Sequence, residues 1–115
     1  MASDRMRRVD EAVRQVLSDA VAHDLQDPRI GFVTMTSVKT SPDLRHARVY
    51  VSVLGDEARR ASTLAGLSSA HGALQRRLAR DLRLKRTPTL EFVYDDTTDR
   101  AMALEALLRQ EADEA

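Results

Sequence analysis

Cysteine and tryptophan are absent from the chain, and it has only four aromatic residues, three prolines and four glycines. The absence of cysteine excludes disulfide bonds and thiolate metal sites, which suits a reducing cytosol. Four aromatic residues are too few for a sheet that stacks RNA bases as RRM domains do. No apolar stretch approaches the length of a membrane span, and no apolar segment follows the charged N-terminus. We therefore expect a cytoplasmic protein that does not enter membranes.

The usual signatures of catalysis are also missing. Neither a Walker loop nor a Gly-x-Gly-x-x-Gly motif occurs. His23, His46 and His71 lack metal-ligand spacing, and the acidic residues between Asp95 and Asp99 fit a strand-to-helix turn with a capping residue. We expect no enzyme activity, no cofactor and no metal site.

The formal net charge is zero, but the two signs are separated along the chain. Residues 1–90 carry 16 basic and 10 acidic side chains, a net charge of +6, whereas residues 91–115 carry 2 and 8, a net charge of −6. This asymmetry predicts a basic functional surface followed by an acidic tail. A genome rich in arginine codons would explain why most of these cations are arginine, but not why they cluster.

Hydrophobic periodicity predicts a single domain, 1–115, with the element order α-β-β-α-kink-α-β-α. The predicted elements are an N-terminal helix at 4–25, a β-hairpin at 32–54, a kinked helix at 56–86, a strand at 89–95, a C-terminal helix at 98–110 and an acidic, frayed tail at 111–115. A hairpin joined by a helical crossover to a third strand predicts an α+β two-layer sandwich with the helices on one face of the sheet. Strict alternation along 46–54 predicts one buried and one open face of the sheet.

The helix predicted at 56–86 needs a break. Unbroken over 56–84, it would be about 42 Å long, whereas a compact chain of this size has a radius of gyration of about 13 Å. The small residues around Ala70-His71-Gly72, preceded by Ser68 and Ser69, are where we expect the kink. At that position His71 is expected to turn outward or to be buried with a hydrogen bond; a stacking or phosphate contact at the kink is the functional alternative.

Beyond the predicted kink, arginines face away from the apolar side of the helix. At about 100° per residue, Arg76, Arg80 and Arg83 project opposite the leucine stripe that begins at Leu74. Guanidinium groups bind phosphate oxygens through paired hydrogen bonds, so this face predicts RNA binding; a solvated face that binds nothing is the alternative. The three N-terminal arginines oppose the helix dipole, which points to function, or they are solubilising charge. The candidate RNA-binding residues are Arg5, Arg7, Arg8, Arg76, Arg77, Arg80, Arg83, Lys85 and Arg86.

Three segments agree in order and spacing with a known family: 27–31 (Asp-Pro-Arg-Ile-Gly), 41–53 (Ser-Pro-Asp-Leu-Arg-His-Ala-Arg-Val-Tyr-Val-Ser-Val) and 82–95, with its Leu-Arg-Leu start and its Pro, Leu, Phe, Tyr and Asp positions. Over about residues 5–110 the chain resembles ribosome-binding factor A. The resemblance implies a KH-like fold of the bacterial type II topology. It also implies that Ala70-His71-Gly72 is the family's Ala-x-Gly helix kink, in place of the Gly-x-x-Gly loop of other KH domains.

The same resemblance implies a function. Members of this family bind the precursor small (30S) ribosomal subunit and contact its 16S rRNA, assisting late rRNA processing and maturation without catalysis. We accordingly expect a monomer that has no membrane or small-molecule partner. The chain departs from the family at Thr89, where glutamate is usual, and in its short acidic tail, which replaces a longer extension.

Two rival functions remain open from the residues alone. The first is a protein-interaction module that docks a partner chain on the open sheet face around Tyr50. The second is a small hydrolase, although His23-Asp24 has no visible nucleophile partner.

Overall fold

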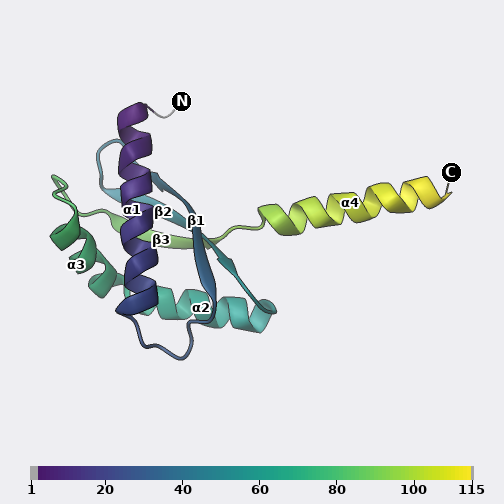
Figure 1. Cartoon of the computed structure of the whole chain (residues 1–115), viewed down its shortest axis with the longest axis horizontal. Helices are drawn as coiled ribbons and strands as arrows, with labels where there is room; N and C mark the ends of the chain where they lie inside the picture. The colour runs from purple at the N-terminus through teal and green to yellow at the C-terminus, as the bar shows by residue number, and fades with distance from the viewer. Residues whose placement is uncertain (1–2, 115) are drawn as a thin grey trace.

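The computed structural model describes residues 3–114 and confirms the predicted α+β fold and element order (Figure 1). The elements are α1 (Asp4–His23), β1 (Val33–Thr40), β2 (His46–Val53), α2 (Glu57–Ser69), α3 (His71–Asp81), β3 (Thr89–Tyr94) and α4 (Thr97–Glu114). The first helix and the three strands lie within two residues of their predicted bounds.

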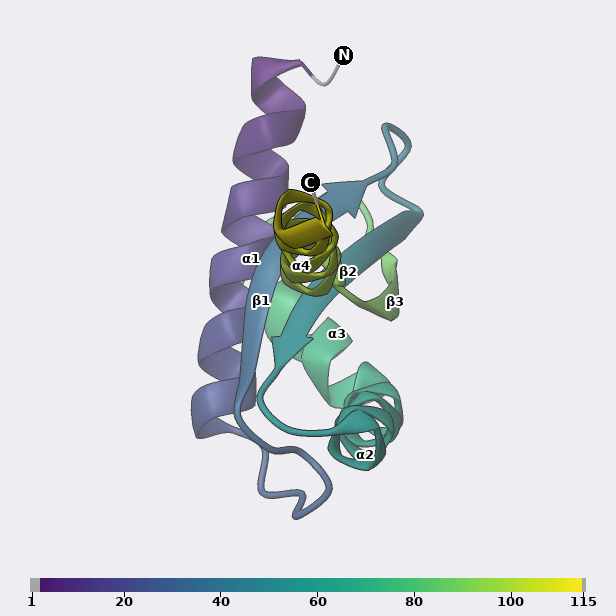
Figure 2. The same ribbon diagram turned by 90° about the vertical axis from the view of Figure 1, so that its right-hand side faces the viewer.

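The three strands form one sheet in the order β1-β2-β3. β1 and β2 are antiparallel, with Val38 opposite Val49, and β2 and β3 are parallel, with Val49 beside Phe92. Figures 1 and 2 show α1, α2 and α3 on one side of this sheet, whereas α4 projects away from the opposite side. One sheet face is therefore covered and the other is open, as the alternation along β2 predicts.

The core lies between the covered sheet face and the three helices. From β2, the alternating residues Ala47, Val49, Val51 and Val53 are buried, while the residues between them face outward. The remaining buried apolar side chains are Val13, Leu17 and Ala20 from α1, Met35 and Val38 from β1, Leu67 from α2, Leu74 and Leu78 from α3, and Leu90 from β3. The leucine stripe of α3 thus fixes which side of that helix faces solvent.

The kink falls at Ala70, the first residue of the predicted motif. Its amide is shared between the carbonyl oxygens of Gly66 and Leu67, both at 3.1 Å, and a new helix starts at the next residue. His71 Nε2 accepts a hydrogen bond of 3.0 Å from the amide of Leu90 at the start of β3. His71 is half-buried and hydrogen-bonded, which lies between the two expected placements, and its imidazole satisfies a backbone donor of the strand next to the helix.

The helix that follows the kink is shorter than predicted. The sequence predicts it to continue to residue 86, but α3 ends at Asp81, and Leu82 is extended with φ −118° and ψ 125°. Residues 82 to 84 alternate, so that Leu82 and Leu84 pack against the core while Arg83 is exposed. Residues i and i+2 lie on the same side of an extended segment but not of a helix. Because Leu82 and Leu84 both pack against the core, the helix ends well before Pro88.

The C-terminal helix differs from the prediction in length and in packing. The prediction of a frayed tail from residue 111 is wrong through Glu114, because α4 continues to that residue; Ala115 lies outside the described residues. The predicted placement of every helix on one sheet face is also wrong, since none of the described side chains of α4 is buried.

Candidate nucleic-acid interface

The outward face of α3 carries the first group of candidate residues. Leu74 and Leu78 are fully buried, and this orients Arg76 and Arg80 toward solvent on the other side of the helix. The Arg80 side chain is 71% exposed and lies 3.3 Å from a carboxylate oxygen of Asp81, its neighbour in sequence. Within residues 3–114, Arg76 forms no ion pair. These two guanidinium groups are accessible to a phosphate backbone.

Arg77 is placed differently from its neighbours. Its guanidinium pairs with Asp81 at 2.6 Å, with Asp24 at 2.5 Å and with Asp19, and its side chain is only 15% exposed. Hydrogen bonding, with Asp81 first, raises the pKa of Arg77, and the same contact lowers the pKa of the Asp81 carboxyl. Arg77 therefore ties α3 to the end of α1, and its low exposure leaves little of the guanidinium accessible to RNA.

An Arg77→Ala variant is expected to unfold at a temperature several degrees lower at pH 7, because it removes the cation that holds these three carboxylates together. The folded-state pKa of Asp81 is depressed, so this stabilisation is present above its unfolded pKa of 3.8 and is lost as pH falls through the lower folded value. The melting-temperature difference from the natural chain should consequently shrink in acid, as thermal melts from pH 7 to pH 3 would show. A matched Arg76→Ala variant should melt like the natural chain, and an equal loss in both variants would contradict the structural role.

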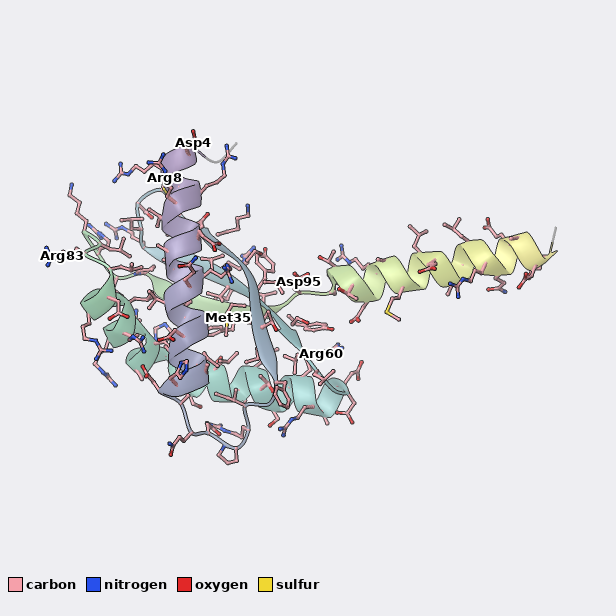
Figure 3. All side chains as sticks on the ribbon, in the orientation of Figure 1. Asp4, Arg8, Met35, Arg60, Arg83 and Asp95 are labelled. Atoms are coloured by element: carbon pink, nitrogen blue, oxygen red, sulfur yellow. The ribbon has the colours of Figure 1, made fainter. Side chains whose placement is uncertain are left out.

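The segment after α3 carries Arg83, Lys85 and Arg86, all exposed. None of the three forms an ion pair within the part of the chain that is described. Figure 3 shows the Arg83 side chain directed away from the domain. The helical angle predicted for Arg83 is wrong because the residue lies outside α3, but its extended neighbours still turn it to solvent.

Three further cations join this segment in space. The carbonyl of Arg45 accepts a hydrogen bond of 2.8 Å from the amide of Thr89, so the β1–β2 turn lies beside the end of the 82–88 segment. Lys39 is directly opposite Arg48 across the antiparallel pair, an unfavourable placement of like charges. We call the surface formed by these cations and those of the segment the basic end: Lys39, Arg45, Arg48, Arg83, Lys85 and Arg86.

The arginines at the start of α1 form a separate group. Ser3 caps the helix by accepting from the Met6 amide at 3.1 Å, and Arg7 pairs with Asp4 at 3.0 Å across exposed side chains. Arg5 and Arg8 are exposed. In both views this end of α1 and the 82–88 segment lie on the same side of the helix kink (Figures 1 and 2). The structure brings these groups toward one end of the molecule without a direct contact between them.

A cavity of about 620 Å³ lies between the end of α1 and the loop leading to β1, and its lining is largely apolar. Its acidic residue, Asp27, is held by Arg29 at 2.6 Å, a contact that also lowers the pKa of this carboxyl. Within residues 3–114 no group of three histidine or acidic residues is placed to hold a metal ion, and no helix is long and apolar enough to cross a membrane.

Known proteins are similar to this chain in sequence and in fold. The family model of ribosome-binding factor A matches residues 5–108. Ribosome-binding factor A of Anaeromyxobacter sp. (strain K) is 53% identical over 108 residues, which cover 93% of this chain and 78% of the relative.

Two structures of relatives have a fold similar to that of this chain. The solution structure of a putative ribosome binding factor A from Thermotoga maritima is 34% identical with a TM-score of 0.72, covering 81% of this chain and 89% of that one. A homology model of Thermus thermophilus ribosome-binding factor A, fitted into the cryo-electron-microscopy map of a complex with the 30S subunit, is 31% identical with a TM-score of 0.63, covering 75% of this chain and 90% of that one. The fold is KH-like, and the chain belongs to the ribosome-binding factor A family.

Proposed function

We propose that this chain is a non-catalytic assembly factor that binds the precursor small (30S) ribosomal subunit, contacts its 16S rRNA and assists late rRNA processing and maturation. It acts in the cytoplasm as a monomer. Binding to the small subunit is supported by membership of the family. It is also supported by the homology model of a relative that was fitted into a map of its complex with the 30S subunit. The observation that carries the rRNA contact is the set of exposed cations on α3 and on the basic end. Arg80, Arg45 and Arg48 each lie beside one acidic residue, and the others form no ion pair within residues 3–114.

The two surfaces have the chemistry that binds a phosphate backbone. Arg76 and Arg80 are held at helical spacing on a face whose opposite side is locked into the core. Each guanidinium can donate two parallel hydrogen bonds to phosphate oxygens and release the counterions that the RNA had condensed. Arg77 is omitted from the proposed contacts because three carboxylates surround its guanidinium and its side chain is only 15% exposed.

The described surface suits recognition of RNA shape and backbone. The aromatic residue of β2 on the open sheet face is Tyr50, which is half-buried. Tyr94 is in register with the buried Val51, on the covered face, and its ring lies under Arg60 at 3.7 Å from the centroid. The open sheet face therefore offers few aromatic rings on which RNA bases could stack. Arginines that a kinked helix holds at fixed angles can instead contact the phosphate backbone of a folded RNA. Specificity then comes from docking on the particle rather than from reading base edges.

The natural chain is expected to co-sediment with purified small subunits and not with large subunits, and the bound fraction should fall steeply as salt rises. The slope of log affinity against log salt is expected to be roughly −0.7 to −0.9 for each phosphate neutralised. Binding that is strong but indifferent to salt would instead favour the protein-interaction module. No association at any salt concentration would refute the proposed function.

A further inference from the structure

The start of α4 is anchored to the sheet. A β-bulge in β1 frees Thr36, whose hydroxyl donates to the Asp95 carboxylate at 2.7 Å. The same carboxylate accepts hydrogen bonds from the Thr97 hydroxyl and, at 3.0 Å, from the Thr97 amide, which forms an Asx turn at the start of the helix. These hydrogen bonds, that of the Thr97 hydroxyl first, lower the pKa of Asp95.

A second contact fixes the direction of the helix. The Tyr94 hydroxyl donates to Asp99 in the first turn at 2.8 Å, and Arg60 of α2 stacks over the Tyr94 ring while approaching Asp99 at 3.5 Å. Figure 3 shows Arg60 and Asp95 on the domain side of the junction, with α4 extending away from both. The fold therefore presents α4 at a defined angle instead of leaving it as a loose tail.

The presented helix carries an apolar face that nothing in the described chain covers. At about 100° per residue, with Leu104 at 0°, Leu107 lies near 300° and Leu108 near 40°. We call this stripe, with Ala101 near 60°, the leucine face. The three leucines are 57–58% exposed. Most helices in proteins gain their stability by burying such a face. The leucine face is thus suited to an apolar groove on a partner.

The charges of α4 identify the chemistry of that partner. Its last turn contains Glu111, Asp113 and Glu114 and no basic residue. The carboxyl end of a helix already carries partial negative charge, so acids there are unfavourable unless a cation meets them. Glu111, near 340°, lies within the leucine face itself. Phosphate backbones and anionic lipid surfaces would be repelled, whereas a cationic protein would be attracted.

We propose that α4 docks through its leucine face into an apolar groove of a basic protein, with cationic residues of that protein meeting Glu111 and Glu114. This inference rests on the proposed function, because the partner is taken to be a protein of the small subunit. The partner is not the rRNA of that subunit. The chain would then hold the particle by two chemically distinct contacts: arginines on rRNA and leucines on protein.

The test compares two variants of the full chain on two probes. Leu104→Gln with Leu108→Gln removes the apolar contact while keeping helix-forming residues, and Met102→Gln is the matched control on the opposite side of α4. Each is titrated against purified small subunits and against protein-free 16S rRNA. The double variant should bind subunits about tenfold or more weakly, as when buried anchors are lost from an interface, and bind protein-free rRNA normally. Met102→Gln should match the natural chain on both probes.

The failures separate the two proposals. If the natural chain does not bind small subunits, both the proposed function and this inference are refuted. If it binds but the double variant binds subunits equally well, only the docking of α4 is refuted. Equal losses on subunits and on protein-free rRNA would mean that α4 contacts RNA. A photocrosslinker substituted for Leu104 should label a basic subunit protein, and labelling of rRNA alone would overturn the proposal.

Discussion

An Arg76→Glu/Arg80→Glu variant is expected to lose co-sedimentation with the small subunit while its circular dichroism spectrum stays that of the natural chain. Both side chains are exposed on α3, and neither contributes to the core, so the fold has no reason to change. Each reversal replaces a bidentate phosphate donor with a group that the phosphate repels. We expect at least about a tenfold loss of affinity for each arginine, since a hydrogen bond to a charged group contributes roughly 1.5–3 kcal/mol.

Neutral variants of the same residues give a second readout. Arg76→Gln with Arg80→Gln should reduce the salt slope by about two, one for each phosphate contact removed. A loss of affinity without a change of slope would point to altered folding or docking instead of lost phosphate contacts.

Arg109→Glu is the matched control for charge reversal. Arg109 is 76% exposed against 71% for Arg80, and each lies beside an acidic residue of its own helix. If the effect of reversal were a general consequence of making the protein more acidic, the Arg109 variant would lose binding as much as a single Arg80→Glu variant. Retained binding by the Arg76/Arg80 double variant would exclude the α3 face as the rRNA contact.

The parts of the fold that the sequence predicts are those in which one periodicity dominates. Ala47, Val49, Val51 and Val53 alternate without interruption, and the structure buries all four. The end of α3 was ambiguous, because Leu82 continues a helical stripe from Leu78 and also starts an extended alternation with Leu84. The period-two solution wins because it packs both leucines on the core, and a pattern cannot show this before the core is assembled.

Other features depend on contacts between residues far apart in sequence. Arg77 looks like its arginine neighbours, and only its local partner Asp81 is visible at helical spacing. Asp19 and Asp24 reach it from α1, more than 50 residues away. Lys39 and Arg48 face each other only through the strand register. The apolar stripe of α4 is visible at helical spacing in the sequence, but a stripe does not say whether its partner belongs to the same chain.

A Leu78→Ala variant is expected to be destabilised by about 2–5 kcal/mol, the range for deleting a fully buried leucine side chain and leaving a cavity. Leu78 has no exposed surface and lies on α3 between the positions of Arg76 and Arg80. For a domain of this size the loss should lower the melting temperature by about 10–20 °C. Urea unfolding would measure the free energy, and an unchanged slope against denaturant would show that the variant still unfolds as one unit.

Leu104→Ala makes the same chemical change at a side chain that is 58% exposed, and its free energy of unfolding should stay within about 0.5 kcal/mol of the natural value. Below its melting temperature, Leu78→Ala should still bind the small subunit, because the arginines on the outer side of α3 are untouched. The two α3 variants are therefore opposite in effect: Arg76→Glu/Arg80→Glu removes binding and spares stability, and Leu78→Ala does the reverse. A loss of less than about 1 kcal/mol in Leu78→Ala would mean that α3 does not pack by its leucine stripe. The conclusion that Arg76 and Arg80 point toward solvent depends on that packing and would then be refuted as well.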